Sequence, residues 1–153
     1  MNINTYKGKI DGKGVKLGIL VSRFNSLVTK NLLDGAIDAC EQFGVEHVDI
    51  YYVPGSFEIP VVLKNLMESG KHDAYVVLSA VIRGETPHFD FVAGELTRGI
   101  GRLMTEYGKP VAFGTVTTET LEQALDRAGA KMGNKGRDAV MTVLETLSVI
   151  KID

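Results

Sequence analysis

The segment from Arg83 to His88 carries the residue types best suited to chemistry in this chain of 153 residues. It reads Arg-Gly-Glu-Thr-Pro-His and follows a strongly apolar run, so we expect it to begin where a buried strand ends. A histidine titrates near neutral pH and can both donate and accept protons. Gly84 lets the main chain approach a ligand closely, and the N–H groups leading into a helix at Phe89 can hold an anion. The loop therefore predicts acid–base chemistry beside an anion-binding position.

The other histidines and the single cysteine give no such signal. A lone loop histidine is more often structural than catalytic, but the place of His88 at the mouth of the most apolar strand favours catalysis. His47 and His72 each precede an expected strand among charged residues, which favours solvated side chains. Cys40 lies at helical spacing among apolar residues, so we expect a buried structural thiol, compatible with a reducing cytosol. No metal site is predicted, because no further ligand stands at metal-binding spacing around His88.

A second charged segment, residues 127–137, collects positive charge at Arg127, Lys131, Lys135 and Arg137. It is not a Walker A loop, because its glycine spacing is one residue short, no Ser or Thr follows the lysine, and no strand precedes it. A tight connection between two helices is the plainer interpretation. In a chain of net charge −2 the cluster nevertheless indicates an anionic substrate group. Such a connection need not reach the crevice of its own chain, so the charge could serve the site of a neighbouring subunit.

Four apolar runs without polar alternation predict parallel strands covered on both faces, over residues 15–21, 47–53, 74–82 and 111–116. Apolar residues at helical spacing follow within residues 33–40, 89–103 and 139–147. Gly70 and Gly108 stand where helix C-caps are expected, and Thr120 with Gln123 resembles a capping box. The alternation predicts one domain over residues 1–153. Its class is α/β: a flavodoxin-like three-layer sandwich, with a four-stranded parallel sheet and helices on both faces. Residues 3–10 could add an edge strand or pair with a neighbouring subunit.

Aromatic and polar residues gather where these strands are expected to end. Ligands of open α/β sheets bind outside the carboxyl ends of the strands. Phe24 follows the first strand, Phe57 and Glu58 follow the second, and His88 follows the third. Each phenylalanine could simply pack against its following helix. Together with Glu58 and His88, they predict a pocket that stacks a flat ring and hydrogen-bonds a polar chain.

Composition excludes several other functions. The net charge of −2 leaves no excess of basic residues for general nucleic-acid binding. No apolar run approaches the roughly 20 residues needed to cross a bilayer. The N-terminal residues lack the apolar stretch of a secretion signal. We therefore expect a soluble cytoplasmic protein that binds neither nucleic acid nor membrane.

Longer motifs at residues 53–60 (Val-Pro-Gly-Ser-Phe-Glu-Ile-Pro) and 81–90 (Val-Ile-Arg-Gly-Glu-Thr-Pro-His-Phe-Asp) are followed by shorter ones at residues 113–114, 120–124, 127–129 and 131–136. In order and spacing they resemble the 6,7-dimethyl-8-ribityllumazine synthase family. The resemblance implies a transferase of riboflavin biosynthesis that needs no cofactor and no metal. The implied reaction condenses 5-amino-6-(D-ribitylamino)pyrimidinedione with 3,4-dihydroxy-2-butanone 4-phosphate, giving 6,7-dimethyl-8-ribityllumazine, phosphate and water.

The resemblance also implies a role for each site residue. The pyrimidine and ribityl side would be formed by Phe24, Ser56, Phe57, Glu58, Ala80, Val81, Ile82, Phe113 and Lys135. The phosphate would be held by the main chain of Glu85 and Thr86 and by the side chain of Arg127. His88 would donate and accept protons, with Arg127 and Lys135 as its catalytic partners, and Asp138 is a candidate to orient His88 or Lys135. Only the backbone role of Glu85 transfers, since a carboxylate beside a phosphate is unfavourable.

In this family the site would lie between adjacent subunits of a pentamer. The resemblance implies that Phe24, Phe57 and His88 come from one chain and that Phe113, Arg127 and Lys135 come from the next. The compact connection at residues 131–136 favours a 60-subunit icosahedral shell, which could enclose riboflavin synthase. Two other interpretations are a non-catalytic flavin- or lumazine-binding module and a purely shell-forming protein of the same fold. The joint presence of His88, Arg127 and Lys135 favours the enzyme.

Overall fold

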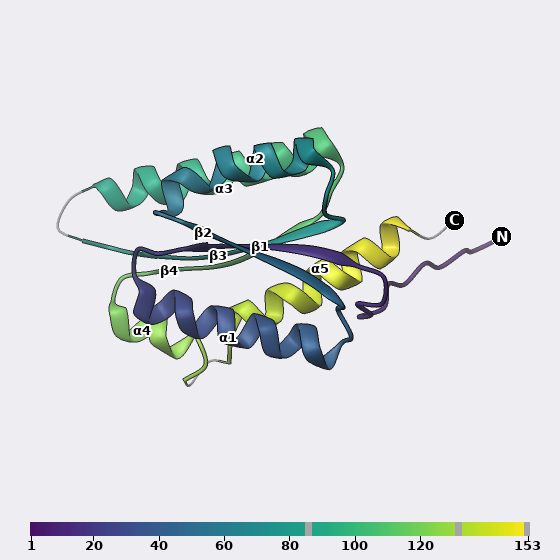
Figure 1. Cartoon of the computed structure of the whole chain (residues 1–153), viewed down its shortest axis with the longest axis horizontal. Coiled ribbons are helices and arrows are strands. Elements are labelled where there is room, and N and C mark those ends of the chain that lie inside the picture. The colour runs from purple at the N-terminus through teal and green to yellow at the C-terminus, as the bar shows by residue number, and fades with distance from the viewer. Residues whose placement is uncertain (85–86, 131–132, 152–153) are drawn as a thin grey trace.

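The computed structural model describes residues 1–84, 87–130 and 133–151, and within them strands and helices alternate along the chain (Figure 1). The strands are β1 (Lys16–Ser22), β2 (His47–Val53), β3 (Ala74–Ile82) and β4 (Val111–Thr118). The helices are α1 (Ser26–Gln42), α2 (Ile59–Ser69), α3 (His88–Tyr107), α4 (Leu121–Asp126) and α5 (Lys135–Ile150), with a short 3-10 helix, η1 (Ser56–Glu58). The predicted alternation is confirmed, and β4 runs two residues beyond its predicted end.

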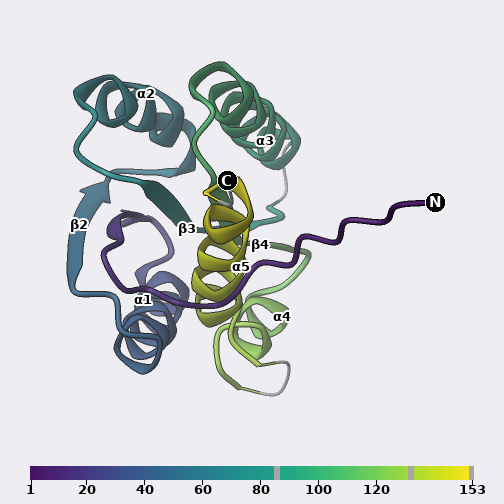
Figure 2. The same cartoon turned by 90° about the vertical axis from the view of Figure 1, so that its right-hand side faces the viewer.

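The strands form one four-stranded sheet in the order β2-β1-β3-β4, and each neighbouring pair is parallel. Helices α2 and α3 lie over one face of this sheet, and α1, α4 and α5 lie over the other (Figures 1 and 2). The predicted three-layer, flavodoxin-like α/β sandwich is therefore confirmed. Because the order departs from β1 in both directions, the loops after β1 and β3 diverge to opposite faces and leave a crevice at their carboxyl ends.

Strand β3 supplies the centre of both cores. Val76 and Leu78 belong to the apolar cluster on the side of α1 and α5, whereas Tyr75 and Val77 belong to the cluster on the side of α2 and α3. These four side chains are all fully buried. A strand covered on both faces reads as a continuous apolar run, as the sequence predicted for this segment.

Helix ends follow the predicted capping signals. Gly70 and Gly108 adopt positive φ angles of 69° and 63° directly after α2 and α3. Thr120 and Gln123 form a reciprocal capping box, in which the Gln123 N–H donates to Thr120 Oγ1 at 3.1 Å. Because α4 has only six residues, this cap supplies an important share of its hydrogen bonds.

The prediction that every strand is covered on both faces of the sheet is wrong for β2. This strand is the edge of the sheet, and its Ile50 and Tyr52 side chains are 37% and 63% exposed. The flanking helices pack mainly over the inner strands, so the apolar run of β2 does not translate into burial.

The N-terminal segment adds no edge strand to the described sheet, so that expectation is wrong for this chain. Residues 1–13 have no strand structure and run along the α1 and α5 side before leaving the body (Figure 2). The Lys9 N–H donates to Ser148 Oγ at 3.0 Å, and the Gly12 N–H donates to the Phe43 carbonyl at 2.8 Å. These contacts hold the segment against helices rather than beside a strand. Pairing with a neighbouring subunit stays a prediction.

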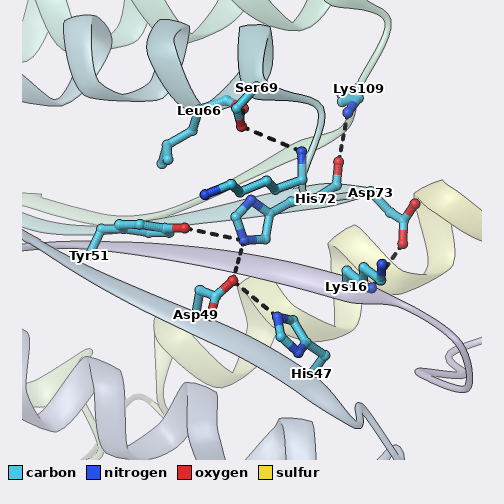
Figure 3. Close-up of polar contacts among 10 residues, drawn as sticks. Lys16, His47, Asp49, Tyr51, Leu66, Ser69, His72, Asp73 and Lys109 are labelled. Atoms are coloured by element: carbon cyan, nitrogen blue, oxygen red, sulfur yellow. Dashed lines mark hydrogen bonds and ion pairs between the residues drawn. The ribbon is translucent and has the colours of Figure 1, made fainter.

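His72 is the clearest departure from the sequence analysis, because its side chain is buried and not solvated (Figure 3). Its Nε2–H donates to Asp49 Oδ2 at 2.7 Å, and the exposed His47 donates to the same oxygen at 3.1 Å. The rings of Tyr51 and Tyr75 lie edge-on to the imidazole, at centroid distances of 5.7 Å and 5.4 Å. The two histidines lower the pKa of Asp49, His72 contributing most. The expectation of a solvated side chain is confirmed for His47 alone.

Candidate active site

An open cavity of about 510 Å³ lies at the carboxyl ends of the strands, in the size range of small-molecule sites. It brings together eight residues that the sequence analysis assigned to the site: Phe24, Ser56, Phe57, Glu58, Ala80, Val81, Ile82 and His88. They lie in the loop after β1, in η1 after β2, at the end of β3 and at the start of α3. The cavity therefore occupies the switch point between β1 and β3.

Two exposed aromatic rings form part of the cavity wall. Phe24 is 71% exposed and Phe57 is 57% exposed, which is unusual for large apolar side chains. Aromatic faces of this kind bind a flat ring by stacking and by burial of apolar area. The arrangement suits a planar heterocycle.

Asn25 fixes the loop that carries Phe24, and the sequence analysis gave it no role. Its backbone is left-handed, with φ 61°, and its Nδ2 donates to the Ala80 carbonyl at 2.9 Å. The Phe24 N–H donates to the Pro54 carbonyl at 3.1 Å. The loop is thereby attached to the ends of both neighbouring strands. Asparagine tolerates positive φ better than most residues, and this preference was the available signal.

The polar side of the cavity is formed by η1. Ser56 is buried, its hydroxyl hydrogen-bonded to the Ser79 hydroxyl, while Glu58 is half-buried with its carboxylate near Gly55. A hydroxyl and a carboxylate side by side can bind the hydroxyl groups of a sugar-like chain. This matches the predicted polar half of the pocket.

His88 is the first residue of α3, so it stands at the helix terminus that faces the cavity. The N-terminus of a helix carries partial positive charge and free N–H groups, which favour a bound anion. Arg83 lies beside it: its guanidinium bonds Glu119 at 2.8 Å and Asp90 at 3.4 Å, and it stacks on Phe89 at 4.4 Å. Arg83 therefore joins the end of β3 to the end of β4 and to the first turn of α3.

Phe113, Arg127 and Lys135 do not line this cavity in the described chain. Phe113 lies on β4, 43% exposed, and the two cationic residues flank the connection between α4 and α5. The Lys135 N–H donates to the Arg127 carbonyl at 2.9 Å, so these two residues lie side by side. Glu85, Thr86 and Lys131 lie outside the described residues.

The connection between α4 and α5 is a tight helix junction, as its plainer interpretation predicted. Asn134 caps α5 by accepting from the N–H groups of Gly136 at 2.8 Å and Arg137 at 3.1 Å. Arg137 itself pairs with Asp38 of α1 at 3.0 Å. Asp138 lies exposed in the first turn of α5, outside the cavity lining, and its orienting role stays a prediction.

Residues 1–84, 87–130 and 133–151 contain no group of three or more His, Cys, Asp or Glu side chains arranged to hold a metal ion. In the same ranges, no helix has the length and apolar character of a membrane span. Cys40 is buried, and burial raises the pKa of its thiol to about 11, as expected for a structural cysteine.

Residues 14–151 match the family model described as 6,7-dimethyl-8-ribityllumazine synthase. The chain belongs to this family. Membership places it among the transferases of riboflavin biosynthesis, which act on small molecules and form oligomeric assemblies. The matched range holds every strand of the sheet and all the cavity residues of this lumazine synthase family member. Residues 1–13 precede the matched range.

Proposed function

We propose that the chain catalyses the condensation of 5-amino-6-(D-ribitylamino)pyrimidinedione with 3,4-dihydroxy-2-butanone 4-phosphate to 6,7-dimethyl-8-ribityllumazine, with release of phosphate and water. One observation carries this proposal: a single cavity in a lumazine synthase family chain joins two exposed phenylalanines, a Ser–Glu pair and a histidine at a helix N-terminus. These groups match a flat ring, a polyhydroxy chain and a phosphorylated partner, respectively.

The pyrimidine substrate would occupy the inner part of the cavity. Its ring would stack against Phe24 and Phe57, with the backbone of residues 80–82 beneath it. The ribityl chain would extend toward Ser56 and Glu58, whose oxygens accept from its hydroxyl groups. The ring amine would then face the mouth of the cavity, where the second substrate enters.

His88 would handle the protons of the reaction. Attack of the amine on the ketone gives a carbinolamine, which loses water to form an imine, and phosphate then leaves by elimination. Tautomerisation and attack of the second amine close the ring with loss of water. Each step needs a proton moved to or from neighbouring atoms of the four-carbon substrate, and an imidazole can donate and accept it in turn. Holding both substrates in one cavity supplies the orientation that the condensation needs.

The phosphate would lie at the N-terminus of α3 and be clamped by Arg127 of an adjacent subunit. No Lys or Arg side chain lines the cavity among the residues that the structure describes, so a cation must be supplied from elsewhere to match the phosphate charge. Arg127 and Lys135 lie together at the junction between α4 and α5. We propose that a neighbouring chain supplies both, with Phe113, while the main chain of Glu85 and Thr86 completes the phosphate site.

This arrangement requires at least one neighbouring subunit, and we propose a pentamer. We further propose that twelve pentamers form a 60-subunit shell in the cytoplasm, which could enclose riboflavin synthase. The compact α4–α5 junction supports the shell, because it adds no long insertion between neighbouring subunits. The mass of the purified assembly, measured by analytical ultracentrifugation, distinguishes a pentamer from a shell.

The reaction itself is tested by supplying both substrates and identifying the products. We expect formation of 6,7-dimethyl-8-ribityllumazine, seen by mass spectrometry, together with one inorganic phosphate for each lumazine. Omission of either substrate should abolish both products. Phosphate release without lumazine, or lumazine formation no faster than in protein-free buffer, would rule out the proposed activity.

A further inference from the structure

A buried pair of hydroxyl groups lies directly behind the polar side of the cavity. Ser79 of β3 is fully buried and does not line the cavity, whereas Ser56 of η1 is 7% exposed and does line it. The two hydroxyl oxygens are hydrogen-bonded to each other. Ser79 is therefore joined by one hydrogen bond to a side chain that lines the cavity.

Ser79 lies among apolar side chains, so packing alone does not explain why a hydroxyl group stands at this position. Alternation along β3 places Ser79 on the same face as Tyr75 and Val77, in the apolar layer beneath α2 and α3. A hydroxyl buried among apolar groups is costly unless it is hydrogen-bonded. The Ser56 hydroxyl is the partner that relieves this cost.

The hydrogen bond to Ser79 limits the orientations that the Ser56 hydroxyl can adopt toward the cavity. A hydroxyl has one proton to donate and lone pairs to accept. If Ser79 donates, the proton of Ser56 is left for a ligand oxygen; if Ser56 donates, its lone pairs are left for a ligand hydroxyl. In either case the free rotation of the Ser56 hydroxyl is restricted, which is the effect expected of a supporting group behind a binding residue.

We propose that Ser79 is a positioning residue that orients the Ser56 hydroxyl toward the polyhydroxy chain of the substrate. This inference rests on the proposed function, because that function places the ribityl chain against Ser56. Ser79 would contribute to the preference for ligands that carry the chain, and it would leave recognition of the ring unchanged.

Ser22 provides a matched control. It ends β1, next to Val21, whose register partner on β3 is Leu78, so Ser22 lies one step further along, beside Ser79. Like Ser79, it is fully buried, but its hydroxyl has no hydrogen-bond partner among the described residues. Ser22→Ala therefore removes an equivalent buried hydroxyl without touching the bond to Ser56.

The test compares two ligands that share a ring and differ in the chain. These are 6,7-dimethyl-8-ribityllumazine and 6,7,8-trimethyllumazine, titrated into the assembled wild-type and variant proteins by isothermal calorimetry. We expect Ser79→Ala to weaken binding of the ribityl ligand about 5-fold, as loss of one neutral hydrogen bond implies. Binding of the trimethyl ligand should change by less than about 2-fold, and Ser22→Ala should change neither affinity by more than that.

Coupling to Ser56 provides a second readout. In a Ser56→Ala background, Ser79→Ala should cause no further loss, because the hydroxyl that it positions is already absent. If Ser79→Ala fails to fold, Ser79→Cys replaces it, since a thiol of similar size is a weak hydrogen-bonding group.

Equal losses for both ligands, an equal loss in Ser22→Ala, or an undiminished loss in the Ser56→Ala background would overturn the positioning role. A wild-type protein that neither binds the ribityl ligand nor forms lumazine contradicts the proposed function as well. A wild-type protein that does both, with a Ser79→Ala variant indistinguishable from it, contradicts the positioning role alone.

Discussion

Gly136 of α5 packs directly against the main-chain carbonyl of Leu32 in α1, and a Cβ atom at this position would overlap that carbonyl. Asn134 also links the two helices, because it caps α5 and its Nδ2 donates to the Asn31 carbonyl of α1 at 3.0 Å. Gly136 and Asn134, which belong to a segment that resembles a phosphate loop in the sequence, are thus engaged in helix packing.

Gly136→Ala is expected to destabilise the fold by about 1–3 kcal/mol, because the two helices must separate to admit a methyl group. Gly101→Ala in α3 is the matched control: a Cβ there meets nothing within 4 Å, and alanine favours a helix by about 0.5–1 kcal/mol over glycine. Urea unfolding of both variants measures the difference. A Gly136→Ala variant as stable as wild type would contradict the close helix contact.

The buried His72 makes its shortest side-chain hydrogen bond to Asp49. Asp49→Ala should cost about 1–3 kcal/mol of unfolding free energy, because it removes the short bond at 2.7 Å and leaves the buried N–H donor with only the longer contact to the Tyr51 hydroxyl at 3.4 Å. His47→Ala removes only the exposed partner of the same carboxylate, and should cost less than about 0.5 kcal/mol. Equal losses of unfolding free energy in Asp49→Ala and His47→Ala would show that the buried hydrogen bond to His72 does not contribute more to stability than the exposed one to His47.

The Asp49 carboxylate should also make the stability of the fold depend on pH, in a direction set by its lowered pKa. The pKa of Asp49 is lowered in the folded protein, chiefly by the His72 hydrogen bond, so the unfolded chain binds its proton more readily. Its stabilising contribution is present above the unfolded pKa of about 3.9, and is lost as pH falls through the lower folded value. Stability measured from about pH 5 to pH 3 should fall more steeply for wild type than for Asp49→Asn. Parallel curves would contradict this contribution.

Arg127→Ala should raise the KM for the phosphorylated ketone about 10-fold or more, because it removes a charge-assisted bond to the phosphate, and leave the KM for the pyrimidine nearly unchanged. Arg137→Ala is the control, since Arg137 belongs to the same junction but pairs with Asp38. Steady-state kinetics with each substrate varied in turn separates the two effects. Equal rises in both KM values for Arg127→Ala would exclude the phosphate clamp.

The sequence was sufficient for features that depend on local patterns. The continuous apolar run of β3 and the Thr120–Gln123 capping box were read correctly, because burial on both faces and helix capping leave direct marks in the sequence. Phe24 and Phe57 both line the cavity, because the ends of parallel strands meet at one edge of the sheet.

The missed features depend on contacts between distant segments. The buried His72 side chain is hydrogen-bonded to Asp49 and Tyr51 of β2. No sequence pattern near His72 predicts these two partners. The Ser79 hydroxyl is hydrogen-bonded to Ser56, which is 23 residues away, so no local pattern predicts the contact. Exposure of Tyr52 follows from the edge position of β2, which local spacing does not specify.

The initial rate of lumazine formation, measured against protein-free buffer, tests the central claim most directly. We expect wild type to accelerate the condensation strongly and His88→Ala to reduce kcat by about 10²–10⁴-fold, while affinity for the product stays close to that of wild type. Correctly assembled wild-type protein that matches the buffer rate would contradict the proposed function, and an unimpaired kcat in His88→Ala would contradict the role of His88.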